Sequence, residues 1–191
     1  MPMTRAHTCC FTGHRPDKLP WGTDERDPRC LALKRSILRE LEGLYRRGWR
    51  HFISGMALGC DLYFAEAVLE LKEAYPALTL EAALPFPGQA DRWPAPSRER
   101  WRAVLEACDR QTVVSGRYDR GCMLRRDRYM VSRSSALLAV FSGAPGGTKY
   151  TLDYASGQGL GILLLDPARP AAPAVRLEPA GGQENFFDFS H

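Results

Sequence analysis

Residues 136–148 read ALLAVFSGAPGGT, and this stretch decides the fold class. Its first six residues are all apolar, which is typical of a strand buried on both faces of a parallel sheet. The next seven are rich in glycine and end at Thr148, where a segment with helical patterning begins. A buried strand that passes through a short glycine-rich loop into a helix predicts an α/β protein with a parallel sheet.

The same alternation extends from this stretch toward both ends of the chain. Helices are predicted from the Asp27-Pro28 cap to Gly48, at 61–74, after a Ser97 cap, at 124–133 and at 148–156. Strands are predicted at 8–12, 51–54, 78–84, 112–115, 136–141 and 161–165. Right-handed crossovers between such strands give a Rossmann-like open, mostly parallel sheet with helices on both faces.

Length and composition fit one domain with a tail. The chain has 191 residues, 45% of them hydrophobic and 25% charged, with a formal net charge of +4. Residues 1–165 are predicted to form a Rossmann-like domain, and 166–191 a proline-rich tail. Its prolines, from Pro167 to Pro179, are expected to exclude a regular element, while Phe186, Phe187 and Phe189 are candidates for docking on the body or on a partner.

The lengths of the apolar runs and the spacing of the cysteines argue against a membrane protein, a zinc protein and a disulfide-bonded protein. The sequence has neither an apolar run of membrane-spanning length nor a leader-like start, so we expect a cytoplasmic protein without a membrane partner. Six cysteines occur without a CxxC pair, which predicts no metal site and no disulfide. Cys9 and Cys10 are adjacent in a predicted strand and should point to opposite faces.

Small residues follow four of the predicted strands, as Thr12-Gly13, Ser54-Gly55, Ser115-Gly116 and Ser142-Gly143. In open α/β sheets, ligands bind beyond the carboxyl ends of the strands, so these turns are predicted to face a ligand. Backbone N–H groups at 146–148 open a helix and suit a phosphate. The alternative is a strand turn followed by an ordinary threonine cap.

Five further positions or segments carry polar groups with two interpretations each. Asp61 suits a ribose hydroxyl, or caps a helix. Glu66 lies one turn later and faces either the site or solvent. Arg15, in a rigid Arg-Pro turn, suits phosphate recognition or lies on the surface. The predicted helix at 124–133 begins with a basic run, which either contacts phosphates and a base or forms a solvated face; it consists of Arg125, Arg126 and Arg128 with Tyr129. The proline-rich loop before the Ser97 cap carries side chains that either cover a base or pack their own loop, namely Gln89, Arg92 and Trp93.

Three groups of motifs carry a resemblance to a known family. They are CCFTGHRPDKL (9–19), ISGMALGCD (53–61), and the later GCM (121–123), RYMV (128–131) and GGT (146–148). Together they resemble the YpsA-like branch of the SLOG superfamily, which also holds the DprA and LOG proteins. The resemblance covers residues 8–165 and implies a Rossmann-like fold with a nucleotide-derived ligand such as ADP-ribose or NAD.

One departure separates this chain from the LOG enzymes, which cleave the N-glycosidic bond of nucleoside monophosphates. Their PGGxGTxxE motif corresponds here to 145–151, and Thr151 stands where the catalytic Glu would be. This removes the expected acid or base. Cleavage would need a substitute such as Asp61, Glu66 or Asp153.

The leading hypothesis is therefore binding or sensing of ADP-ribose, NAD or a similar nucleotide, with no cofactor required and no metal. The first alternative is an N-glycosidase-like hydrolase, with Asp61 and Glu66 as catalytic candidates. The second is DprA-like binding of single-stranded nucleic acid, which the mild positive charge and the basic cluster at 125–128 support. A homo-oligomer is expected. The ligand-binding candidates are Thr12, Gly13, His14, Arg15, Ser54, Gly55, Met56, Gly59, Asp61, Arg128, Gly146, Gly147 and Thr148.

Overall fold

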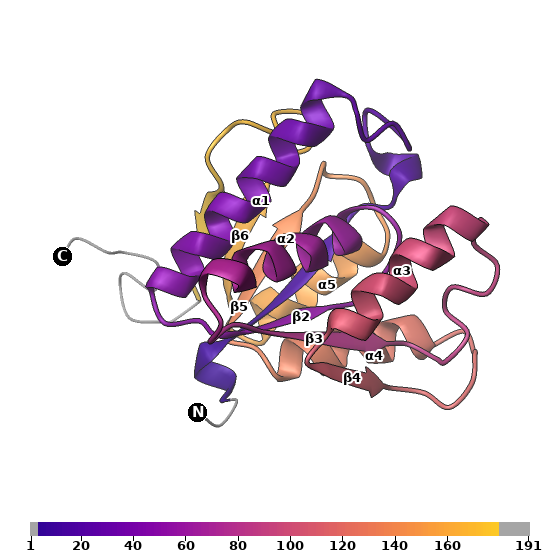
Figure 1. The fold of residues 1–191 in the computed structure, drawn as a ribbon. Helices are drawn as coiled ribbons and strands as arrows, with labels where there is room; N and C mark the ends of the chain where they lie inside the picture. The colour runs from indigo at the N-terminus through magenta and orange to yellow at the C-terminus, as the bar shows by residue number, and fades with distance from the viewer. Residues whose placement is uncertain (1–3, 180–191) are drawn as a thin grey trace.

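The computed structural model describes residues 4–179 and has a single sheet with helices on both faces (Figure 1). Its strand order is β4-β3-β2-β1-β5-β6-β7. The strands are β1 (Thr8–Gly13), β2 (His51–Ser54), β3 (Thr79–Leu84), β4 (Arg110–Val113), β5 (Ala136–Val140), β6 (Gly161–Leu165) and β7 (Val175–Leu177). The first six pair in parallel and β7 is antiparallel to β6, so the predicted Rossmann-like fold class is confirmed.

Five α-helices form the two outer layers. Helices α1 (Pro28–Arg46), α2 (Cys60–Ala74) and α3 (Ala95–Ala107) lie on one face, and α4 (Cys122–Ser132) and α5 (Gly147–Gly157) on the other (Figure 1). Each layer buries its own apolar cluster against the sheet. Cys9 belongs to the cluster under α1 and α2, and Cys10 to the cluster under α4 and α5, as the strand alternation predicts.

The start of α1 shows how local sequence sets an element. The Asp27 carboxylate accepts a hydrogen bond from the backbone N–H of Arg29 at 2.7 Å, and Pro28 occupies the first helical position, which needs no donor. The chain leaves the helix through Gly48, whose φ of +107° a side chain rarely adopts. Both predicted ends of this helix are confirmed within the usual uncertainty of boundaries.

Three predicted boundaries are wrong. Helix α3 begins at Ala95 rather than after Ser97, since Pro96 is tolerated in a first turn. Helix α4 begins at Cys122, two residues earlier than predicted, behind a turn in which Asp119 accepts from the N–H of Gly121 at 2.7 Å. Strand β4 covers Arg110–Val113 instead of 112–115, because it is an exposed edge strand whose polar residues hide its start.

The segment after β6 also differs from the prediction. The expectation that prolines exclude any regular element from 166 onward is wrong for β7, which contains no proline and pairs with β6. The segment before it packs on the body, since the Ser36 hydroxyl donates to the Pro170 carbonyl at 2.6 Å. The three phenylalanines at 186, 187 and 189 lie outside the described residues.

Residues 4–179 contain neither a membrane-spanning helix nor a metal-binding group of side chains. No helix in this range combines the length and the apolar character that crossing a membrane requires. No group of three histidine, cysteine or acidic side chains within it is arranged to hold a metal ion.

Candidate functional site

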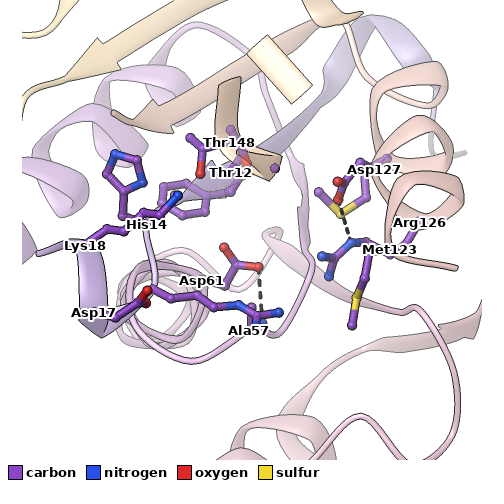
Figure 2. Close-up of a pocket in the computed structure, with 15 residues that line it drawn as sticks. Thr12, His14, Asp17, Lys18, Ala57, Asp61, Met123, Arg126, Asp127 and Thr148 are labelled. Carbon is purple, nitrogen blue, oxygen red and sulfur yellow. Dashed lines mark hydrogen bonds and ion pairs between the residues drawn. The ribbon is translucent and has the colours of Figure 1, made fainter. Parts of the chain in front are cut away.

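The chain reverses direction across the sheet between β1 and β5. From β1 it continues to α1 on one face, and from β5 to α5 on the other face, so the loops after these adjacent strands diverge and leave a crevice. A cavity of about 300 Å³ occupies this position (Figure 2). Its lining residues are Phe11, Thr12, Gly13, His14, Arg15, Asp17, Lys18, Ala57, Asp61, Met123, Arg126, Asp127, Met130, Gly147 and Thr148.

The loop after β1 forms the first wall of the cavity. Gly13 is required there by packing, because an added Cβ would lie 2.5 Å from the Cβ of Cys60. The buried His14 ring has a defined tautomer, since the backbone N–H of Ser142 donates to its Nε2 at 3.0 Å. The ring is therefore neutral with its proton on Nδ1, and burial together with the nearby Lys18 charge lowers its pKa.

The start of α5 forms the second wall. Gly146 has a φ of +136° and precedes Gly147, the first residue of the helix. The Lys18 ammonium donates to the Pro145 carbonyl at 2.7 Å and so connects this loop to the loop after β1. The first backbone N–H groups of a helix have no acceptor within it, and here Gly147 and Thr148 line the cavity. An anion at this wall would meet unpaired donors and the positive end of the helix dipole.

Two hydroxyl groups complete this side. Thr12 and Thr148 are both nearly buried, and both line the cavity (Figure 2). Neither side chain has a hydrogen-bond partner among residues 4–179. They can therefore donate to, or accept from, a molecule in the cavity.

Asp61 lies at the base of the cavity. The Ser54 hydroxyl donates to its backbone carbonyl at 3.0 Å, and its side-chain Oδ2 accepts from the N–H of Ala57 at 3.2 Å. Burial raises the pKa of this carboxyl to about 6, against the opposing attraction of the Arg126 guanidinium. The group therefore changes charge near neutral pH, as a general acid or base must.

Arg126 forms the third wall from α4. Its Nε donates to Asp127 at 2.7 Å, and its Nη1 donates to the Gly55 carbonyl, which also accepts from the Gln89 amide at 3.0 Å. Its Nη2 has no partner among the described residues, although the side chain is nearly buried and lines the cavity. The guanidinium is thus held from one side and presents donors on the other (Figure 2).

The structure divides the sequence-predicted candidates into three sets. Seven line the cavity directly, namely Thr12, Gly13, His14, Arg15, Asp61, Gly147 and Thr148. Five lie behind its lining and shape the loops, namely Ser54, Gly55, Met56, Gly59 and Gly146. Two are outside it: Arg128 donates to the Tyr150 hydroxyl at 2.6 Å, and Glu66 pairs with Arg100 at 2.5 Å.

Several lining residues are not among the predicted site residues, namely Lys18, Met123, Arg126, Asp127 and Met130, although Arg126 belongs to the predicted basic run. The four of these residues that belong to α4 are spaced three and four apart, so they lie on one face of the helix. This spacing could have been recognised in the sequence. The long crossover from β4 to β5 cannot be predicted from a local pattern, and it is this crossover that brings that helix face against the end of β1.

Comparisons with known proteins agree with this architecture. The model of the YspA SLOG family matches residues 9–159. A UPF0398 protein of Bacillus velezensis is 30% identical over 148 residues, which are 75% of this chain and 80% of that protein. A UPF0398 protein of Halalkalibacterium halodurans is 30% identical over 149 residues, 76% of this chain and 78% of the relative.

Solved structures of DNA processing protein A share the fold. The protein from Helicobacter pylori, studied for its single-stranded DNA binding mode, superposes with a TM-score of 0.56 at 16% identity, over 85% of this chain and 66% of that one. The protein from Streptococcus pneumoniae gives 0.56 at 12% identity, over 84% and 50%. With a family model that spans most of the domain and relatives of 30% identity, the chain belongs to the YspA SLOG family.

Proposed function

We propose that this protein binds a nucleotide-derived ligand, of which ADP-ribose and NAD are the leading candidates, in the cavity between β1, α4 and α5. One observation carries the proposal: the amino terminus of α5 and the loop after β1 meet at a single cavity that holds two unpartnered hydroxyls. Arg15 and Lys18 add positive charge at its mouth. Unpaired donors and positive charge at a helix start are what a phosphate group requires.

The other walls suit the remaining parts of such a ligand. The carboxylate of Asp61 is an acceptor for a ribose hydroxyl, and the Nδ1–H of His14 is a donor. Apolar side chains of Phe11, Met123 and Met130 offer a surface for a base. The volume of about 300 Å³ lies at the small end of the roughly 300–1,000 Å³ found for ligand pockets, so part of a dinucleotide would extend into solvent.

A second candidate, hydrolysis of a nucleotide N-glycosidic bond, is favoured by Asp61 alone. Its carboxyl is buried, faces the cavity and has a pKa of about 6, which suits an acid–base role. Thr151 cannot supply that role, because it is fully buried and its hydroxyl donates to the Gly147 carbonyl at 2.9 Å. Glu66, paired with Arg100 away from the cavity, is a poorer candidate.

The test is a ligand-observed proton NMR experiment with ADP-ribose, NAD, AMP and a short single-stranded oligonucleotide. Saturation transfer identifies which molecule binds, and the ribose anomeric signals report whether a glycosidic bond breaks. We expect transfer to ADP-ribose or NAD with anomeric signals that stay constant over hours. Loss of an anomeric signal with release of free base would establish the hydrolase instead. Transfer to the oligonucleotide alone, with steep salt dependence, would favour single-strand binding.

A further inference from the structure

A second cavity lies at the opposite edge of the sheet, where the parallel strands begin. It encloses about 130 Å³ between the first residues of β1, β2 and β4 and the end of α4. Its lining residues are Thr4, Arg5, Thr8, His51, Ile53, Glu81, Arg110, Ser132 and Arg133. None of them lines the first cavity, so the two are separated by the length of the strands.

The floor of this cavity is a buried carboxylate whose oxygens are already occupied. Glu81 Oε1 accepts from the Tyr129 hydroxyl at 2.6 Å and from the Thr112 hydroxyl at 2.7 Å. Its Oε2 lies 3.0 Å from His51 Nε2, and His51 Nδ1 lies 2.8 Å from the Thr79 hydroxyl. Both oxygens of the Glu81 carboxylate are thus hydrogen-bonded within the protein, and this carboxylate holds the His51 ring in position.

Three arginines line this cavity, and among the described residues most of their N–H donors make no hydrogen bond. Arg110 Nε lies 3.8 Å from Glu81 Oε2, so these two side chains form an ion pair without a hydrogen bond. Arg133 is placed over the Tyr129 ring at 5.0 Å. Within residues 4–179 neither guanidinium makes a hydrogen bond. Arg5 donates from Nε to the Ser134 carbonyl at 3.0 Å and from Nη2 to the Gln158 carbonyl at 3.3 Å, and its Nη1 makes no hydrogen bond with the described residues.

The negative groups near the rim are satisfied within the protein. At the end of α4, the Met130 and Val131 carbonyls accept from the N–H of Arg133, and Ser134 also donates to both. The hydroxyl of Thr8 donates to the Thr4 carbonyl at 2.8 Å, and that of Ser132 to the Tyr129 carbonyl at 2.8 Å. Three guanidinium groups therefore line a cavity with one carboxylate, which pairs with Arg110 and is hydrogen-bonded to three other side chains, so positive charge is in excess.

We propose that this cavity binds one phosphate-type oxyanion, either the free ion or the terminal phosphate of a small metabolite. Unpaired guanidinium donors are the groups that recognise phosphate most specifically. The volume fits the choice: 130 Å³ is the space of about four waters, enough for a tetrahedral oxyanion and too little for a nucleoside. The site is independent of the proposed nucleotide site.

The test follows the side-chain Nε–H signals of ¹⁵N-arginine-labelled full-length protein during titration with inorganic phosphate at constant ionic strength. We expect saturable shifts of the Arg110 and Arg133 signals. Arg133→Gln and Arg110→Gln should each weaken binding about tenfold or more, as loss of a charge-assisted hydrogen bond predicts. The matched control is Arg102→Gln, at an exposed arginine on α3, which should leave the affinity unchanged.

Two further arms make the outcome decisive. Methyl phosphate that binds as well as inorganic phosphate indicates a substituted phosphate as the natural ligand, while weaker binding indicates the free ion. Prior saturation with ADP-ribose should leave the phosphate affinity unchanged, so failure of either site is seen separately. Shifts that are linear in concentration and equal for all arginines, or unchanged affinity in both rim variants, would overturn the proposal.

Discussion

Asp61 is the side chain whose charge state should matter most to the free energy of folding. Its pKa rises from 3.8 to about 6 in the folded protein because burial disfavours the carboxylate. The folded state therefore holds this proton more tightly than the unfolded chain. The resulting stabilisation is complete below pH 4 and is lost as the pH rises through 6.

We therefore expect the free energy of unfolding of the wild-type protein to fall, relative to that of Asp61→Asn, by up to about 3 kcal/mol between pH 4 and pH 7. Urea denaturation at several pH values measures it. The control is Asp153→Asn on the surface of α5, where an exposed ion pair contributes little. Parallel wild-type and Asp61→Asn curves over this range would show that Asp61 has an ordinary pKa.

Gly147 offers a way to separate charge from shape at the proposed phosphate wall. No atom lies within 4 Å of a Cβ added there, so neither Gly147→Gln nor Gly147→Glu brings its Cβ against another atom, and the two side chains are nearly equal in size. A glutamate at the first helical position favours the helix dipole, so the fold should be as stable or more stable. Its charge would repel a phosphate, and its affinity for ADP-ribose should be at least about tenfold below that of the glutamine variant.

Isothermal titration of both variants with ADP-ribose checks this prediction, with thermal unfolding to establish that each is folded. Equal affinities of the Gln and Glu proteins would remove the start of α5 from the phosphate site.

At the scale of elements, the start of α2 depends on Gly59. Its φ of +87° and ψ of −127° are conformations that side chains rarely adopt, and an added Cβ would lie 2.8 Å from the His14 carbonyl oxygen. Gly59→Ala should therefore cost about 1–3 kcal/mol of folding free energy and displace the loop that carries His14.

A matched glycine in another helix serves as the control. Gly157 ends α5 with open space around its missing Cβ and no positive φ, so Gly157→Ala should be neutral or slightly stabilising. Chemical denaturation of both variants provides the comparison. A Gly59→Ala protein as stable as the Gly157→Ala protein would contradict the role assigned to the loop contact.

The elements differ in how far their sequence predicts them. β5 and α5 are predictable, because an apolar strand and a glycine-rich turn carry strong local signals. β4 and β7 are not, since an edge strand takes its hydrogen bonds from one neighbour and its exposed residues show no burial pattern. The glycines of 55 and 59 illustrate the same limit: their role is close packing against Arg126, Asp61 and His14, which only the folded chain specifies.

At the scale of the whole molecule, the first cavity lies between groups from the helical layers on both faces of the sheet. The loop after β1 and α2 contribute from one layer, and α4 and α5 from the other. A ligand held by all of them binds the folded state alone. At a hundred times its dissociation constant it should stabilise the protein by about 2.7 kcal/mol.

Differential scanning calorimetry with and without ADP-ribose measures this increment. At the same ligand concentration, the Gly147→Glu protein should lose about half of the increment or more, while its unfolding temperature without ligand is not lowered. A ligand that raises the wild-type and Gly147→Glu unfolding temperatures equally would bind elsewhere. The position of the cavity at the chain reversal could be predicted from strand order, whereas the contribution of α4 depends on tertiary packing.

The two neighbouring thiols of β1 report separately on the local opening of the two helical layers. Cys9 is sealed under α1 and α2, Cys10 under α4 and α5, and burial raises the pKa of both thiols. Neither reacts until its own layer lifts from the sheet. The alkylation rates of Cys9 and Cys10, resolved by mass spectrometry, therefore measure separately how often each helical layer opens. A ligand that contacts both layers should lower both rates together.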